Sequence, residues 1–140
     1  MELVENKSLV FVEGAHFSYD GTVTLKLSDK RELKLAAEIW TGLGQPKDLP
    51  LTDEQQELLE KEACYTTIRN KILSFLAARE HSAFELRRKL QQRFYKSAAF
   101  DVSALVERCL LEMQKRDFQS DERFTNRFVE SKLANNPHGP

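Results

Sequence analysis

Residue types that perform catalysis or bind metal ions are few and scattered in this sequence. The three histidines, His16, His81 and His138, lie far apart, and none has metal-ligand spacing to another histidine or to a cysteine. The sequence also lacks the glycine-rich loops that hold phosphates and the tight turn that presents a nucleophilic serine in hydrolases. We therefore predict that the chain is not an enzyme and has no catalytic residue, no metal site and no cofactor.

The two cysteines, Cys64 and Cys109, are expected to pack in the core rather than to perform redox chemistry. They are too few for a disulfide framework, and no Cys-x-x-Cys pair is present. The N-terminus is acidic, unlike a signal peptide, and no apolar run approaches the roughly 18–20 residues that span a bilayer. These features predict a cytoplasmic protein that binds no membrane.

Basic residues gather in one segment of the chain. Residues 66–99 carry eight Lys or Arg and two Asp or Glu, whereas residues 1–65 carry seven basic and thirteen acidic residues. A basic surface of this kind attracts phosphates or acidic protein faces. The alternative is a solvated helix face whose charges pair with acids elsewhere in the fold. The charge distribution alone leaves both interpretations open.

The first 40 residues have the patterns of strands. Val23, Leu25 and Leu27 alternate with polar residues, and the preceding Asp20-Gly21 is a hairpin turn signal. Gly14 is expected to mark a β-bulge. We predict a three-stranded antiparallel β-meander followed by a short helix over residues 36–43. Together these form a β-rich N-terminal domain over residues 1–50.

The remaining residues, 51–140, have the pattern of helices. Thr52, Ser82, Asp101 and Ser120 are expected to cap four successive helices, and Ser82 forms a capping box with Glu85. A faint repeat at a spacing of 56 residues aligns the first helix with the fourth. We therefore predict an α+β protein in which a three-helix repeat, about 52–116, precedes the first helix of a second repeat, about 120–135. Apolar side chains, including Phe124 and Phe128, are expected to face inward.

Two blocks of residues in the helical region resemble the RecX family. The first block matches the pattern L-x-x-R-x-x-S-x-x-E-L-x-x-K-L, and the second matches an aromatic residue followed by x-x-D-E-R-F. The pattern continues through Phe128 and Ser131-Lys132 to His138-Gly139-Pro140. The residues that carry the two blocks are Leu76, Arg79, Ser82, Glu85, Leu86, Lys89 and Leu90, and then Phe118, Asp121, Glu122, Arg123 and Phe124.

The chain departs from the family pattern at three positions. The family usually has Gly where Asp117 stands, Ala where Thr125 stands, and often Arg where Lys132 stands. The β-rich start is similar to an N-terminal extension that some members carry. Because RecX proteins are arrays of three three-helix repeats, the resemblance leads us to expect that this chain is an N-terminal fragment of a longer protein.

The resemblance implies a regulator of the RecA recombinase. Such a protein binds the RecA–DNA filament and restrains recombinase and coprotease activity, in homologous recombination, DNA repair and the SOS response. The implied partners are the RecA filament with single-stranded DNA and, weakly, nucleic acid itself, with no small-molecule substrate. The alternative is a helical DNA-binding or adaptor module that acts independently of RecA.

Matching the family blocks separates residues expected to bind a partner from residues expected to support the fold. Arg88 is the preferred contact residue because nothing in its own helix requires it, whereas Arg79 is also explained by a helix C-terminus. The expected partner-binding residues are Arg79, Arg87, Arg88, Lys89 and Arg93. The expected structural residues are Ser82, Glu85, Leu86, Leu90, Phe118, Asp121, Phe124 and Phe128.

Overall fold

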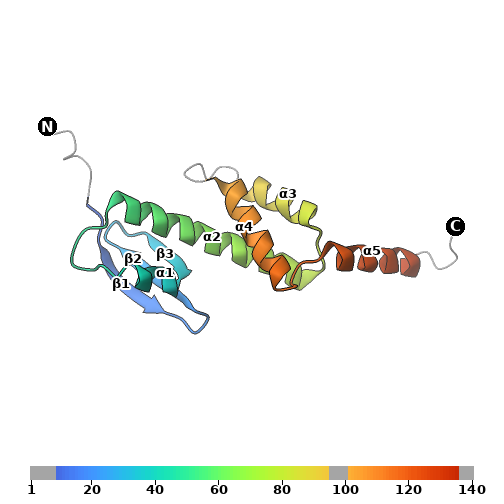
Figure 1. Ribbon diagram of the computed structural model, residues 1–140, viewed down its shortest axis with the longest axis horizontal. Helices are drawn as coiled ribbons and strands as arrows, with labels where there is room; N and C mark the ends of the chain where they lie inside the picture. Colours follow the sequence, from blue (N-terminus) through green and yellow to red (C-terminus); the bar gives the residue numbers. More distant parts are fainter. Residues whose placement is uncertain (1–8, 95–100, 136–140) are drawn as a thin grey trace. The chain divides into compact units, whose positions relative to one another are not determined.

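A three-stranded antiparallel sheet and five helices form the described part of the chain, and they confirm the predicted α+β class (Figure 1). The computed structural model describes residues 9–94 and 101–135. Contacts divide the chain into two compact units, Met1–Thr66 and Thr67–Pro140. The elements are β1 (Val12–Phe17), β2 (Thr22–Leu27), β3 (Glu32–Ala36), α1 (Ala37–Gly42), α2 (Asp53–Ala78), α3 (Ala83–Phe94), α4 (Val102–Lys115) and α5 (Asp121–Asn135).

The sheet of the first unit has the order β1-β2-β3 and buries one face. Val23 pairs with Leu35, and the register of β1 shifts next to Gly14, which confirms the predicted bulge. The predicted hairpin turn is also present, with Gly21 at a φ of 85° that favours glycine. The Asp20 carboxylate stabilises this turn by accepting hydrogen bonds from the backbone N–H and the hydroxyl of Thr22.

The boundary between the two compact units lies within α2, at Thr66, and not at residue 50 where the sequence suggested a domain boundary. The first turns of α2 belong to the sheet unit because Leu59 packs in its core with Trp40 and with Leu51, which precedes the helix. Arg31 also forms an ion pair with Glu60. The start of the long helix therefore completes the sheet's core, which a three-stranded meander needs in order to be stable.

The second unit contains the C-terminal half of α2 together with α3, α4 and α5. α3 and α4 pack against each other, and both contribute apolar faces to the interior. The carboxylate of Asp101 accepts a hydrogen bond from the N–H of Ala104 at 3.2 Å, which confirms the predicted cap of α4. The buried apolar side chains are Ile68, Ile72, Ala83, Leu86, Leu90, Val102, Leu105, Val106, Cys109, Leu110 and Met113.

α5 presents more apolar surface than its sequence pattern predicts. Phe124 is half-buried, but Phe128 is 53% exposed and Leu133 is 66% exposed. The expectation that Phe128 faces inward is therefore wrong for the part of the chain that the structure describes. Its ring stacks on Phe124 with the centroids 6.2 Å apart instead of entering a core. The motif residues at 138–140 lie outside the described residues.

Candidate partner-binding surface

The two blocks of the RecX pattern meet where α2 joins α3 and α4 joins α5. We call residues 79–83, Glu85 and residues 117–123 the block junction. A carboxylate oxygen of Asp121, at the start of α5, accepts hydrogen bonds from the N–H of Ala83 at 2.9 Å and from Nε2 of Gln119 at 3.0 Å. Asp121 therefore satisfies an otherwise unpaired N–H in the first turn of α3 as well as occupying the start of its own helix.

Gln119 is the central buried polar residue of the block junction, and only 2% of its surface is exposed. Besides Asp121, its Nε2 donates to the carbonyl oxygen of His81 at 3.2 Å. Its Oε1 accepts a hydrogen bond from Nε2 of Gln114 at 2.9 Å. A buried amide with all these partners holds the chain segments around it in one arrangement. No signal in the sequence pointed to this residue.

Arg123 links the two blocks by charge. Its Nε lies 2.6 Å from a carboxylate oxygen of Glu80, and its Nη1 lies 3.3 Å from Asp117. Asp117 has a φ of 60° and follows α4 in a Schellman motif, because the next N–H, that of Phe118, donates to the carbonyl of Met113. The backbone at residue 117 thus has the left-handed conformation for which the family's usual glycine is suited.

The capping box predicted at the start of α3 is present. The hydroxyl of Ser82 accepts from the N–H of Glu85 at 3.1 Å, and the Glu85 carboxylate accepts from the N–H of Ser82 at 3.2 Å. The same carboxylate pairs with both terminal nitrogens of Arg79. The hydrogen bonds from Arg79, supported by that from Ser82, lower the pKa of Glu85 to about 2. Glu85 is therefore both a cap and an ion-pair partner.

His81 is buried, with 2% of its surface exposed, and it binds Lys89, one of the residues expected to contact a partner. Burial lowers the pKa of His81, which favours the neutral ring. Nδ1 lies 3.0 Å from the carbonyl oxygen of Arg79, so it carries the proton and donates. Nε2 then accepts from Nζ of Lys89 at 2.9 Å, and the same ammonium lies 4.8 Å from the ring centroid of Phe75. Lys89 is therefore engaged within the fold.

The five expected partner-binding residues divide into two groups. Arg79 and Lys89 are engaged in the block junction, and Arg87 forms a two-pronged pair with Glu107 at 2.6 and 3.2 Å. Arg88 and Arg93 are exposed, and within the part of the chain that the structure describes neither forms an ion pair or side-chain hydrogen bond. Only these two of the five cations are therefore fully available to a partner.

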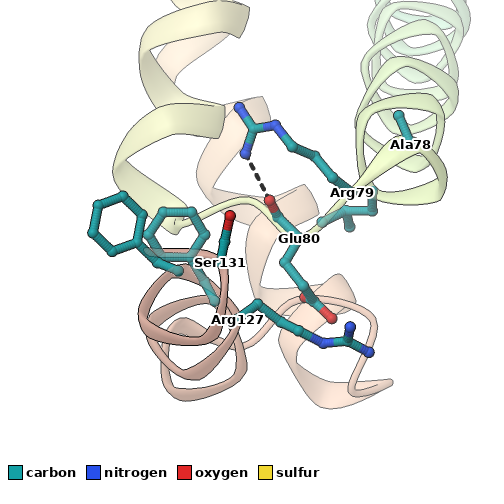
Figure 2. Close-up of a pocket in the computed structure, with 8 residues that line it drawn as sticks. Ala78, Arg79, Glu80, Arg127 and Ser131 are labelled. Atoms are coloured by element: carbon teal, nitrogen blue, oxygen red, sulfur yellow. Dashed lines mark hydrogen bonds between the residues drawn. The ribbon is translucent and has the colours of Figure 1, made fainter. Parts of the chain in front are cut away.

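A groove of about 550 Å³ lies beside the block junction, between the end of α2 and α5 (Figure 2). Arg79 spans one side of it, and its Nη1 donates to the carbonyl oxygen of Glu80 at 2.7 Å, the dashed line in Figure 2. Four apolar side chains and three charged ones give the groove a mixed character. Its lining residues are Leu76, Ala78, Arg79, Glu80, Phe124, Arg127, Phe128 and Ser131.

Residues 9–94 and 101–135 also lack two general features. No group of three or more histidine, cysteine or carboxylate side chains in these ranges could hold a metal ion. None of the helices there is long and apolar enough to cross a membrane. The groove beside the block junction carries both charged and apolar side chains.

Comparison with known proteins supports the family resemblance. Regulatory protein RecX from Haemophilus influenzae strain PittEE is 34% identical over 64 residues, which cover 46% of this chain and 38% of that protein. The protein of the same name from strain Rd matches to the same extent. The resemblance to the RecX family is confirmed. No family model matches the chain. The aligned segment spans about two fifths of the length of these RecX relatives.

The fold is shared with RecX over nearly the whole chain. A crystal structure of regulatory protein RecX superimposes with a TM-score of 0.63 at 14% identity, covering 91% of this chain and 60% of that one. Because so much of the chain is covered, the shared fold includes residues of the β-rich unit as well as of the helical unit. Segments of the two RecX blocks meet at the block junction, where Asp121 accepts from the N–H of Ala83 and Arg123 pairs with Glu80.

Proposed function

We propose that this chain is the part of a RecX-type regulator that binds the RecA filament on single-stranded DNA and restrains recombinase and coprotease activity. The observation that carries the proposal is the pairing of the two RecX-like blocks in one junction, next to a helix whose remaining cations are unpaired. The curated relatives are regulatory RecX proteins. We assign the contacts of this chain with the filament to Arg88 and Arg93.

The charge arrangement supports this partner. A nucleoprotein filament presents DNA phosphates and acidic protein side chains, and exposed arginines without internal partners complement both. Arginine is suited to such contacts because its planar guanidinium binds carboxylate or phosphate through two parallel hydrogen bonds. The other three cations, Arg79, Arg87 and Lys89, add to the positive electrostatic potential of this surface. Their side chains already bind partners within the protein.

Co-sedimentation with ATP-loaded RecA filaments on single-stranded DNA tests the proposal. The 140-residue chain should sediment with the filament, and the double variant R88E/R93E should bind about tenfold more weakly. Lys115→Glu reverses one exposed charge on α4 instead of two on α3, and it is the control. Equal sedimentation with and without filament, or equal loss in the control, would overturn the proposal.

A further inference from the structure

Some polar side chains of α3 have partners elsewhere in the second unit, and others have none. Glu85, Arg87 and Lys89 have internal partners, as described above, and Nε2 of Gln91 donates to the hydroxyl of Ser103 at 2.7 Å. These four side chains attach α3 to the rest of the second unit. The exposed side chains of α3 that lack such contacts are the ones open to a partner.

Besides Arg93, the exposed side chains of α3 that remain form a row of three residues spaced four apart: Phe84, Arg88 and Gln92. Residues at this spacing lie along one side of a helix, about 6 Å apart along its axis. All three are exposed, and Phe84 is 69% exposed. Within residues 9–94 and 101–135, none of the three side chains has a hydrogen bond, an ion pair or a ring contact. We call these residues the α3 row.

We infer that the α3 row binds single-stranded nucleic acid. The ring of Phe84 stacks on an unpaired base, the guanidinium of Arg88 binds a backbone phosphate, and the amide of Gln92 hydrogen bonds a base edge. Aromatic rings and arginines that alternate with polar groups are the usual means by which proteins hold single strands. This inference deepens the proposed function, on which it rests, by assigning the nucleic acid of the filament to α3.

The surroundings of Phe84 favour nucleic acid over a protein surface as its partner. Aromatic anchors of protein interfaces are normally enclosed by further contact residues that exclude water. On α3 the row beside Phe84 is a cation and an amide, and no exposed Leu, Ile, Val or Met belongs to this helix. Glu85 is the only carboxylate of α3, and Arg79 neutralises it. Phosphates near the row therefore meet no free negative charge from α3.

Binding of a fluorescently labelled oligo-dT to the 140-residue chain, followed by anisotropy at about 50 mM salt, tests the base contact. Phe84→Ala should weaken binding by roughly five- to a hundredfold, the range for loss of one stacked base. Phe84→Leu should lose most of the same affinity, because it keeps an apolar side chain but removes the ring. Since Phe84 is exposed, circular dichroism should show both variants as folded as the wild-type chain.

Salt dependence tests the phosphate contact. Arg88→Gln should lower the slope of log affinity against log salt by about 0.7, the value for one phosphate of a single strand. Lys115→Gln removes the same charge from α4 and is the matched control, so its slope should equal that of the wild-type chain. A slope unchanged by Arg88→Gln would overturn the assignment of a phosphate to Arg88.

Other outcomes separate this inference from the proposed function. No binding of oligo-dT by the wild-type chain, or equal binding by Phe84→Ala, would overturn the inference. Loss of filament sedimentation by Phe84→Ala with unchanged oligo-dT binding would assign the α3 row to a protein surface and would also overturn it. Row-dependent oligo-dT binding by a chain that fails to sediment with RecA filaments would support the inference while removing the proposed function.

Discussion

The block junction and the α3 row lie within one helical unit, yet their side chains are used in opposite ways. At the block junction, Asp121, Gln119 and Arg123 each contact another segment of the chain. Along the α3 row, Phe84 and Arg88 have no such contact in the described ranges. The difference teaches that the most recognisable motif residues of this chain support its fold, whereas the residues open to a partner lie between them.

The largest expected effect compares the two sides of α3 directly. Leu86→Ala removes a side chain that is fully buried, and it should reduce the free energy of unfolding by about 2–5 kcal/mol. Phe84→Ala, two positions earlier, should change it by less than about 0.5 kcal/mol because the ring is exposed. Urea denaturation measures both. Comparable losses in the two variants would remove the distinction between the supporting and the open side of α3.

The next prediction concerns the buried amide of the block junction. Gln119→Ala should reduce the free energy of unfolding by about 2 kcal/mol, because it leaves the carbonyl of His81 and the Nε2 of Gln114 without their partner. Gln114→Ala removes only one of these bonds, at an exposed residue, and is the control. If Gln119→Ala were as stable as the control, the junction would not hold the two blocks together.

Lowering the pH tests the same comparison between the block junction and the α3 row, because the only carboxylate of α3 belongs to the block junction. The pKa of Glu85 is lowered from 4.5 to about 2 by Arg79, so its ion pair stabilises the fold fully above pH 4.5. That stabilisation is lost as the pH falls from 4.5 toward 2. Between pH 5 and 2.5 the wild-type chain should lose about 1–2 kcal/mol more stability than Glu85→Gln.

Arg79→Gln provides the control for this acid effect. Arg79 is the main cause of the lowered pKa of Glu85, so its removal should bring the pH dependence close to that of Glu85→Gln. Chemical denaturation at a series of pH values measures all three proteins. An acid dependence in Arg79→Gln equal to the wild type would show that the ion pair is not responsible.

The smallest expected effect concerns the departure from the family pattern at residue 117. Asp117→Gly should raise the free energy of unfolding by about 0.5 kcal/mol, because glycine adopts a φ of 60° without strain. The lost contact with Arg123 contributes little, since Asp117 is 84% exposed. Asp117→Asn tests the charge alone and should be nearly neutral. A thermal melt that shows Asp117→Gly to be destabilised would make the Asp117–Arg123 contact part of the junction.

The sequence by itself determined the local features of this protein. The Asp20-Gly21 turn, the Thr52 and Asp101 caps and the Ser82–Glu85 box could all be predicted. Each depends on hydrogen bonds between residues two or three positions apart, so the residue types at that spacing are sufficient. The resemblance to RecX was likewise visible in two short blocks, and the α+β order of elements followed from the change of hydrophobic period.

Only the tertiary structure decided which side chains are used inside the fold and which are free. Asp121 reaches Ala83 across 38 residues, and Arg123 reaches Glu80 across 43. No local pattern predicts such pairs, because the path of the chain through two turns sets the distance between them. The same holds for Arg87, whose partner Glu107 lies on another helix. Arg88, one position later, is exposed and has no ion pair or side-chain hydrogen bond in the described ranges.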